Sequence, residues 1–164
     1  MAKKTVAGLK ACFAGAVGAD GAAGTTLTQI AQPYQGGVTL SGTAPTLNKF
    51  FEENAAYPEA SIPDVTSGGI EVSWEVMDLD DETLKFYFGE SATGGIPEGS
   101  YTGEKTFRFD SLTGQSLLIP RLQYVAVVTG SLNASEPFRI SITGTVLAPK
   151  EGEMAISIIA TPKA

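Results

Sequence analysis

Alternation of apolar and polar residues is strictest in the stretch from Gly68 to Gly89, around which the chain is organised. In its first half, apolar side chains occupy every second position and polar side chains lie between them. This period of two is typical of a strand with one buried and one solvated face. The expected core positions are Ile70, Val72, Trp74 and Val76, and the expected outward positions are Glu71, Ser73 and Glu75.

The pattern changes to a helical period in the second half of this stretch. Leu84, Tyr87 and Phe88 are spaced at i, i+3 and i+4, which predicts one apolar face of a short helix. Asp78 is the expected N-cap and Gly89 the expected C-terminal stop. Leu84 and Phe88 therefore join the predicted core.

Further strands are expected on both sides of this stretch. They cover residues 5–14, 25–34 and 38–42 before it, and residues 101–110, 116–131, 138–144 and 154–161 after it. Pro120 lies within one of these strands and is expected to break it or to place it at an edge, because proline has no N–H to donate.

A second short helix is predicted over residues 47–53. Thr46 is a suitable N-cap, and Leu47, Phe50 and Phe51 repeat the i, i+3, i+4 spacing. Residues 54–67 contain two prolines and are expected to form a loop.

Together these elements indicate a mainly β chain, with a β-sandwich or β-barrel and one or two short flanking α-helices. Residues 1–164 are enough for one domain with a substantial core. Only 18% of the residues are charged and glycine is frequent, which suits short strands joined by turns. Two glycine-rich segments, about 14–37 and about 90–103, are expected to be flexible loops that become ordered against a neighbour.

Acidic residues are concentrated in the middle of the chain. Between Glu52 and Glu90 there are eleven acids and a single lysine, and the whole chain has a net charge of -7. A protein of this charge does not bind nucleic acid by neutralising phosphates, although it can lie close to DNA without adhering to it.

The residue inventory argues against an enzyme. The chain has no histidine, which excludes the usual Ser-His and Cys-His nucleophiles. Cys12 is the only cysteine, so no disulfide can form within the chain, and we expect a buried thiol in a cytosolic fold. The acids from Asp78 to Glu82 lack the glycine and glutamate of a calcium loop and are better explained as first-turn acids of the helix. No cofactor and no metal are expected.

The N-terminal residues are basic and then small, as in a signal peptide. Lys10 and several glycines interrupt the apolar run, which argues against a signal peptide or a membrane span. Lys3, Lys4 and Lys10 are instead candidates to meet acids of an adjacent subunit. The apolar C-terminal strands would also expose sheet edges unless another subunit pairs with them.

The order of elements resembles that of phage tail tube proteins, also called major tail proteins. The segments that carry the resemblance are Gly69–Val76 (GIEVSWEV), Asp78–Leu84 (DLDDETL), Phe88–Gly89, Leu118–Pro120 (LIP) and Met154–Ile159 (MAISII). The resemblance implies a β-sandwich or barrel flanked by a helix, which assembles into rings, commonly hexamers, that stack into a tube.

The same resemblance implies a location and partners. The protein would assemble in the bacterial host cytoplasm, reside in the virion tail, contact other tail proteins and let double-stranded DNA pass without specific binding. Glu71 and Glu75, on the polar face of the predicted strand, are the first candidates for lumen-facing acids, because like charge repels phosphate.

Two other hypotheses about the function are compatible with the sequence. One is a different virion or secretion-tube component, such as a decoration protein. The other is a secreted carbohydrate-binding β-sandwich with Trp74 and Tyr101 as stacking platforms, although the alternation around Trp74 favours a core position.

Overall fold

The computed structural model of the protein describes residues 5–34, 37–50, 53, 60–64, 69–98, 101–131 and 137–162. Within these ranges it is mainly β, as the sequence predicts. The strands are β1 Leu9–Gly15, β2 Thr28–Ile30, β3 Thr39–Thr43, β4 Thr46–Phe50, β5 Ala60–Asp64, β6 Gly69–Val76, β7 Tyr101–Ser111, β8 Gln115–Thr129, β9 Arg139–Val146 and β10 Ser157–Ala160. The helical elements are α1 Asp81–Phe88 and the 3₁₀ turn η1 Ala19–Gly21.

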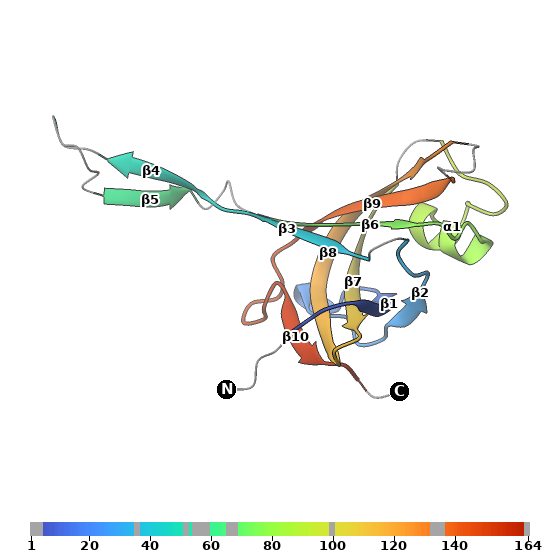
Figure 1. The fold of residues 1–164 in the computed structure, drawn as a ribbon, viewed down its shortest axis with the longest axis horizontal. Coiled ribbons are helices and arrows are strands. Elements are labelled where there is room, and N and C mark those ends of the chain that lie inside the picture. The colour runs from blue at the N-terminus through green and yellow to red at the C-terminus, as the bar shows by residue number, and fades with distance from the viewer. Residues whose placement is uncertain are drawn as a thin grey trace.

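One large antiparallel sheet forms the body of the molecule. Its strand order is β2-β1-β7-β8-β9-β6-β3, and β10 pairs with the first part of β8. The sheet is strongly curled, and α1 lies beside the end of β6 (Figure 1). The hairpin of β4 and β5 is a separate two-stranded sheet that projects on the side opposite α1 (Figure 1).

The predicted core strand is confirmed as β6, with one correction. Val72, Trp74 and Val76 are buried, whereas Ile70 is only partly buried. Ile70 lies beyond the last residue pair between β6 and β9, and on its other side it faces Gly42 of β3, which has no side chain to cover it.

Helix α1 ends at Phe88 with Gly89 as its C-cap, as predicted, but it starts later than predicted. The N-cap is Asp80, not Asp78, because Asp80 Oδ1 accepts a hydrogen bond from the Thr83 N–H at 2.7 Å. This bond lowers the pKa of the Asp80 carboxyl. Gly89 takes a positive φ of 90°, and its N–H donates to Lys85 O.

An aromatic cluster joins the helix to the sheet. Leu84, Tyr87 and Phe88 are buried, which confirms the predicted apolar face. The Trp74 ring meets Phe107 and Phe109 edge-on, at centroid distances of 5.2 and 5.7 Å. Strand β6, helix α1 and strand β7 therefore share one core.

The predicted helix over residues 47–53 is wrong. Residues 46–50 are strand β4, and they pair with β5, which lies within the predicted loop 54–67. A helix this short is marginal alone, so pairing with a second strand can override an apolar spacing that fits both structures. The parts of these two predictions that fall on residues 51–52, 54–59 and 65–68 lie outside the described residues.

Pro120 does not break its strand. Strand β8 runs through it without interruption, and the pairing with β7 shifts register between Lys105 and Phe107. At this bulge the Thr106 hydroxyl donates to Pro120 O at 2.7 Å. The irregularity accommodates the missing proline N–H.

The glycine-rich segment after β1 lies against the body. Gly24 N–H donates to Thr106 Oγ1 at 2.8 Å, and Gly21 O accepts from Lys150 N–H at 3.1 Å. The flexibility predicted for segments 14–37 and 90–103 concerns motion and stays a prediction.

Candidate functional site

The polar face of β6 carries both glutamates that the sequence singles out. Glu75 Oε2 lies 3.1 Å from Arg139 Nε of β9, and both side chains are partly exposed. The contact is an ion pair without a hydrogen bond, because no acceptor is aligned with the Arg139 Nε–H. Glu71 is exposed and has no ion-pair partner among the described residues. The two glutamates therefore share a face but differ in their electrostatic compensation.

Small hydroxyl side chains surround these glutamates across the sheet. We define the outer face as the outward positions of β3, β6 and β9, which are Thr39, Ser41, Thr43, Glu71, Ser73, Glu75, Arg139, Ser141, Thr143 and Thr145. On β7 and β8, beyond this face, Glu104 is paired with Arg121 at 2.7 Å. Because two of the three glutamates on this side of the sheet are paired with arginines, its net charge is smaller than the acidic composition of this part of the chain suggests.

Strand β3 forms one edge of the large sheet. It pairs with β6 on one side, and all five of its residues are exposed. Residues 37–44 carry no charge, and Gly42 is the one glycine within β3. Natural sheet edges are usually protected by charge, proline or a bulge. This edge lacks a protecting charge or proline along its length.

The β4–β5 hairpin, called the arm below, continues from β3 away from the body. Its register runs from Thr46 opposite Asp64 to Phe50 opposite Ala60, and in the described residues neither strand joins the large sheet. Leu47 of the arm is 53% exposed. A two-stranded hairpin alone is only marginally stable in water.

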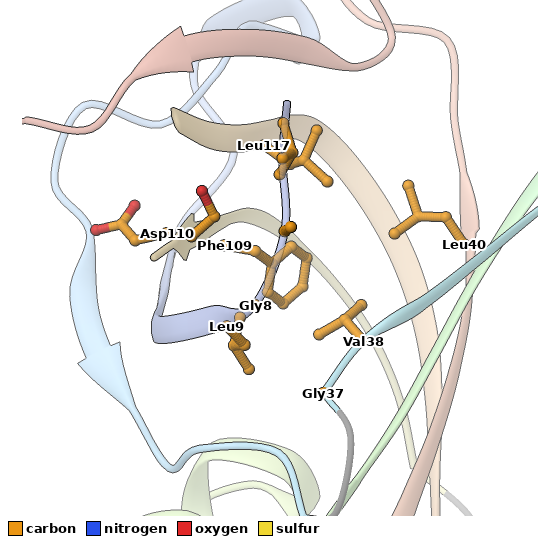
Figure 2. A pocket seen from close by; sticks show the side chains of 11 residues that line it. Gly8, Leu9, Gly37, Val38, Leu40, Phe109, Asp110 and Leu117 are labelled. Atoms are coloured by element: carbon orange, nitrogen blue, oxygen red, sulfur yellow. The ribbon is translucent and has the colours of Figure 1, made fainter. Parts of the chain in front are cut away.

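An apolar groove lies between β1 and β3. We call it the seam groove; it has a volume of about 260 Å³, and its principal lining residues are Leu9, Gly37, Val38, Leu40, Phe109 and Leu117. Figure 2 shows the Phe109 ring and Leu117 between the two sides of the groove. Phe109 is buried against Trp74, so the floor of the groove belongs to the core.

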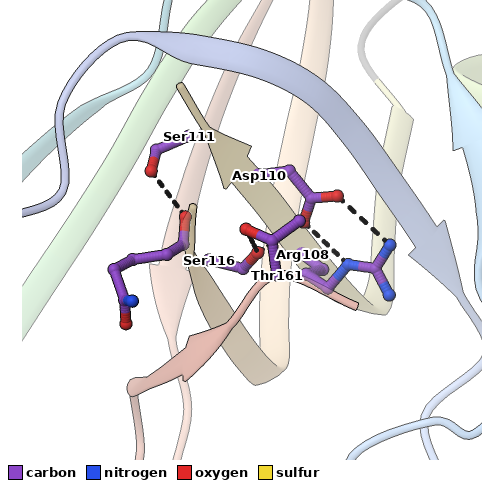
Figure 3. A network of polar contacts seen from close by, with 6 residues as sticks. Arg108, Asp110, Ser111, Ser116 and Thr161 are labelled. Carbon is purple, nitrogen blue, oxygen red and sulfur yellow. Dashed lines mark hydrogen bonds and ion pairs between the residues drawn. The ribbon is translucent and has the colours of Figure 1, made fainter. Parts of the chain in front are cut away.

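A polar network beside this groove holds the last described residues to the sheet. Arg108 donates to both carboxylate oxygens of Asp110, at 2.9 and 3.3 Å, and its guanidinium lies 4.2 Å from the centroid of the Phe13 ring. Ser116 Oγ donates to Asp110 Oδ1 at 2.7 Å and lies 2.9 Å from Thr161 Oγ1 (Figure 3). The chain has no histidine that could activate Ser116 as a nucleophile. The network is therefore best explained by a structural role, which is to hold the last described residues against the sheet.

The other chemical candidates have little support. Cys12 is buried, and burial, with Asp110 nearby, raises the pKa of its thiol to about 12. The acids at the start of α1 do not gather into a metal-binding group anywhere in the part of the chain that the structure describes. Trp74 is 3% exposed and therefore cannot be a stacking platform.

Sequence reasoning missed the arm and the seam groove. The groove joins residues far apart in the chain, so no local pattern marks it. The sequence gives one indication of the unusual structure there, which is the uncharged run of residues 37–44 directly before the arm. Free sheet edges are usually protected by charge, proline or a bulge.

Comparison with known proteins does not identify a family. No protein-family model matches the chain, and a search of curated proteins gives no significant match. No helix within the described residues is both long and apolar enough to cross a membrane.

Proposed function

We propose that this chain is a structural virion protein that assembles into stacked rings and forms the tube of a phage tail, through which DNA is ejected. The observation that carries the proposal is the arm, which leaves the body as a separate two-stranded sheet with Leu47 exposed. A two-stranded hairpin is only marginally stable by itself in water, so contacts with a neighbouring subunit would stabilise it.

The open edge of the sheet supports the same proposal. An uncharged edge such as β3 is a hazard in a monomer, because it can pair with any exposed strand. In a ring, pairing between subunits removes the hazard and gives each contact a fixed register. The combination of a free edge and a projecting arm therefore suits a subunit that its neighbours complete.

The outer face suits a surface along which DNA moves without binding. It presents hydroxyl groups and glutamates, and its single arginine partner is paired with Glu75. Affinity for duplex DNA comes mainly from lysines and arginines that release counterions from phosphate. Repetition of Glu71 around a ring would add a weak repulsion that keeps the DNA away from the wall.

Two other candidate functions are less well supported. A decoration protein or another tube component would share the edge and the arm, and would differ in what it assembles on. A carbohydrate-binding domain loses its best stacking residue because Trp74 is buried, and retains Tyr101, which is 40% exposed.

Electron microscopy of the purified full-length chain, over a range of concentrations, tests the proposal. Rings, or tubes with an open lumen, are expected. A protein that sedimentation velocity shows to be strictly monomeric at the highest concentration would refute it. Assembly only on capsids or on another scaffold would favour the decoration protein.

A further inference from the structure

A polar pocket lies between helix α1 and the first half of strand β7. We call it the helix pocket. It has a volume of about 330 Å³, and its principal lining residues are Lys85, Phe86, Glu90, Tyr101, Lys105 and Tyr124. This volume is at the small end of the range of ligand sites, so the pocket can take one ring-sized molecule. None of these residues belongs to the outer face or to the arm, so the proposed function leaves the pocket unexplained.

The Tyr124 hydroxyl lines the pocket with most of its hydrogen-bonding capacity unused. The residue is 1% exposed, and its hydrogen bond to Phe86 O is 3.4 Å long, against about 2.7 Å for a typical O–H···O bond. No other hydrogen bond of this hydroxyl occurs within the described residues. Burial, with Tyr101 nearby, raises the pKa of the hydroxyl and keeps it protonated. A buried phenol of this kind is a donor that a bound ligand can use.

Two lysines of the same pocket are available to a ligand. Neither Lys85 nor Lys105 forms an ion pair with any residue that the structure describes. The Lys105 ammonium lies 5.0 Å from the centroid of the Phe86 ring, which holds it at the pocket by a cation–π contact. Glu104 also reaches the pocket, but its carboxylate is bound to Arg121 at 2.7 Å. The two ammonium groups therefore favour an anionic ligand.

The charge balance of the pocket selects among anions. The two lysines contribute two positive charges and Glu90 one negative charge, whereas Glu104 is neutralised by Arg121. The sum is one positive charge, which matches a ligand with a single carboxylate. A phosphate dianion would meet repulsion from Glu90, and a zwitterion would leave one lysine without a counter-charge.

An aromatic surface and a hydrogen-bond acceptor complete the pocket. The Tyr101 side chain is 40% exposed, and a Cβ at Gly89 would lie 3.8 Å from its Cε2 atom, so the ring stands beside the end of α1. This partly exposed ring offers an apolar surface to the C–H groups of a ligand. The Glu90 carboxylate can accept hydrogen bonds from ligand hydroxyl groups. A carboxylate, hydroxyl groups and an apolar ring face occur together in an acidic sugar.

We propose that the helix pocket binds a hexuronate, the singly charged acid of a hexose. Its carboxylate pairs with Lys85 and Lys105. Its ring packs on Tyr101, and its hydroxyl groups bond to Tyr124 and Glu90.

The inference goes beyond the proposed function and does not depend on it. Tyr124 is in register with Gly144 and, through it, with the buried Val72, so it lies on the core side of the sheet, opposite to the outer face. The pocket is therefore on the other side of the sheet from the surface proposed to face DNA. Its lining residues all come from one copy, so an unassembled chain contains the whole site.

Ligand-detected NMR of the purified full-length chain tests the inference, with sodium glucuronate and its C4 epimer, sodium galacturonate, as probes. Glucose provides the ring without the carboxylate, and acetate provides the carboxylate without the ring. We expect at least one uronate to bind about tenfold more tightly than glucose and acetate, because its charge-assisted contacts and its ring contacts act together.

Substitutions separate the charged contacts from the ring contact. Lys85→Gln and Lys105→Gln should remove the preference for the uronate over glucose. Tyr101→Ala should weaken the binding of both sugars, and Tyr124→Phe, which keeps the buried ring, should weaken the binding of the uronate. Lys150→Gln, at an exposed lysine outside the pocket, is the matched control and should leave binding unchanged. Thermal denaturation shows whether each variant is folded.

Three results would overturn the inference. The first is that neither uronate binds. The second is that acetate binds as tightly as the uronate, which would show an adventitious ion only. The third is that Lys150→Gln lowers the affinity as much as the pocket variants do. A chain that forms tubes and binds no uronate refutes only this inference, and a strictly monomeric chain that binds a uronate refutes only the tube proposal.

Discussion

Trp74 Nε1 donates a buried hydrogen bond to Tyr87 Oη at 3.1 Å and so joins strand β6 to helix α1. Both side chains are almost completely buried, so neither group has water as an alternative partner. Burial also raises the pKa of the Tyr87 hydroxyl well above its usual value. The phenol is thus held in its protonated form beside the indole.

Removal of the Tyr87 hydroxyl should destabilise the fold although it deletes one atom. Tyr87→Phe leaves the Trp74 N–H buried without a partner, which typically costs about 1–3 kcal/mol. Urea denaturation of Tyr87→Phe, Trp74→Phe and the double variant gives the coupling between the two residues. Strictly additive losses would show that this hydrogen bond contributes little.

The start of helix α1 offers a matched pair of aspartates. Asp80→Ala should lower the thermal midpoint because it removes the acceptor of the Thr83 N–H, whereas Asp78→Ala should have a smaller effect. The Asp80 pKa is lowered in the folded protein, so its contribution is present above the unfolded-state pKa and is lost as the pH falls through the folded-state value. Equal effects of the two substitutions at neutral pH would contradict this assignment.

The periodicity of residues 70–88 predicts the strand, the helix and their shared core. It does not decide which of two aspartates is the N-cap of the helix. Both Asp78 and Asp80 are suitable residue types. The flanking leucines distinguish them, because an Asp80 cap places Leu79 just before the cap and Leu84 at the fourth helical position, the arrangement of a hydrophobic staple. Leu79 packs against the core that Leu84 enters.

The arm shows where local patterns stop being informative. The spacing of Leu47, Phe50 and Phe51 fits a helix face, and the same residues are compatible with a strand. The pairing of residues 46–50 with residues 60–64 decides between them, and it involves a segment with Pro63 that itself resembles a loop. The alternation in residues 70–76 predicts the polar side of β6. The pairing of Glu75 with Arg139 depends on the register between β6 and β9, which the spacing of residues along the sequence does not give.

Gly103 makes room for a buried tyrosine on the neighbouring strand. A Cβ at this position would lie 2.6 Å from the Tyr124 hydroxyl oxygen, which bonds Phe86 O at 3.4 Å. Gly103→Ala should therefore overpack the core and cost about 1–3 kcal/mol. Gly42→Ala is the control, because a Cβ there has no described atom within 4 Å. Chemical denaturation of both variants measures the difference, and a Gly103→Ala protein as stable as the control would refute the packing argument.

Alkaline pH should destabilise the protein through its buried acids. The pKa of Cys12 rises from 9.0 to about 12 on folding, and burial raises the pKa values of Tyr87 and Tyr124 above 10.0. The folded state thus holds these protons more tightly, so stability is retained below pH 9.0 and falls as the pH rises toward 12. Urea midpoints measured across this range, with Cys12→Ala as the comparison, test the sign. A stability independent of pH over this window would contradict it.

Charge reversal on the outer face should separate the roles of its two glutamates. Glu71 has no ion-pair partner among the described residues, so Glu71→Lys adds an uncompensated cation that can hold phosphate. Glu75→Lys adds a cation and also places it beside Arg139, so it should slow DNA passage at least as much and lower stability as well.

Glu71→Gln is the matched control, because it removes the charge without adding a cation. Assembly should be unchanged in Glu71→Lys and Glu71→Gln, since the Glu71 side chain is exposed and has no ion-pair partner among the described residues. Only the lysine variant should retain duplex DNA, with a salt dependence that the wild type lacks. DNA ejection from particles carrying Glu71→Lys should be slower than from the control. Equal ejection and no DNA retention would show that this face does not line the lumen, while leaving the assembly proposal intact.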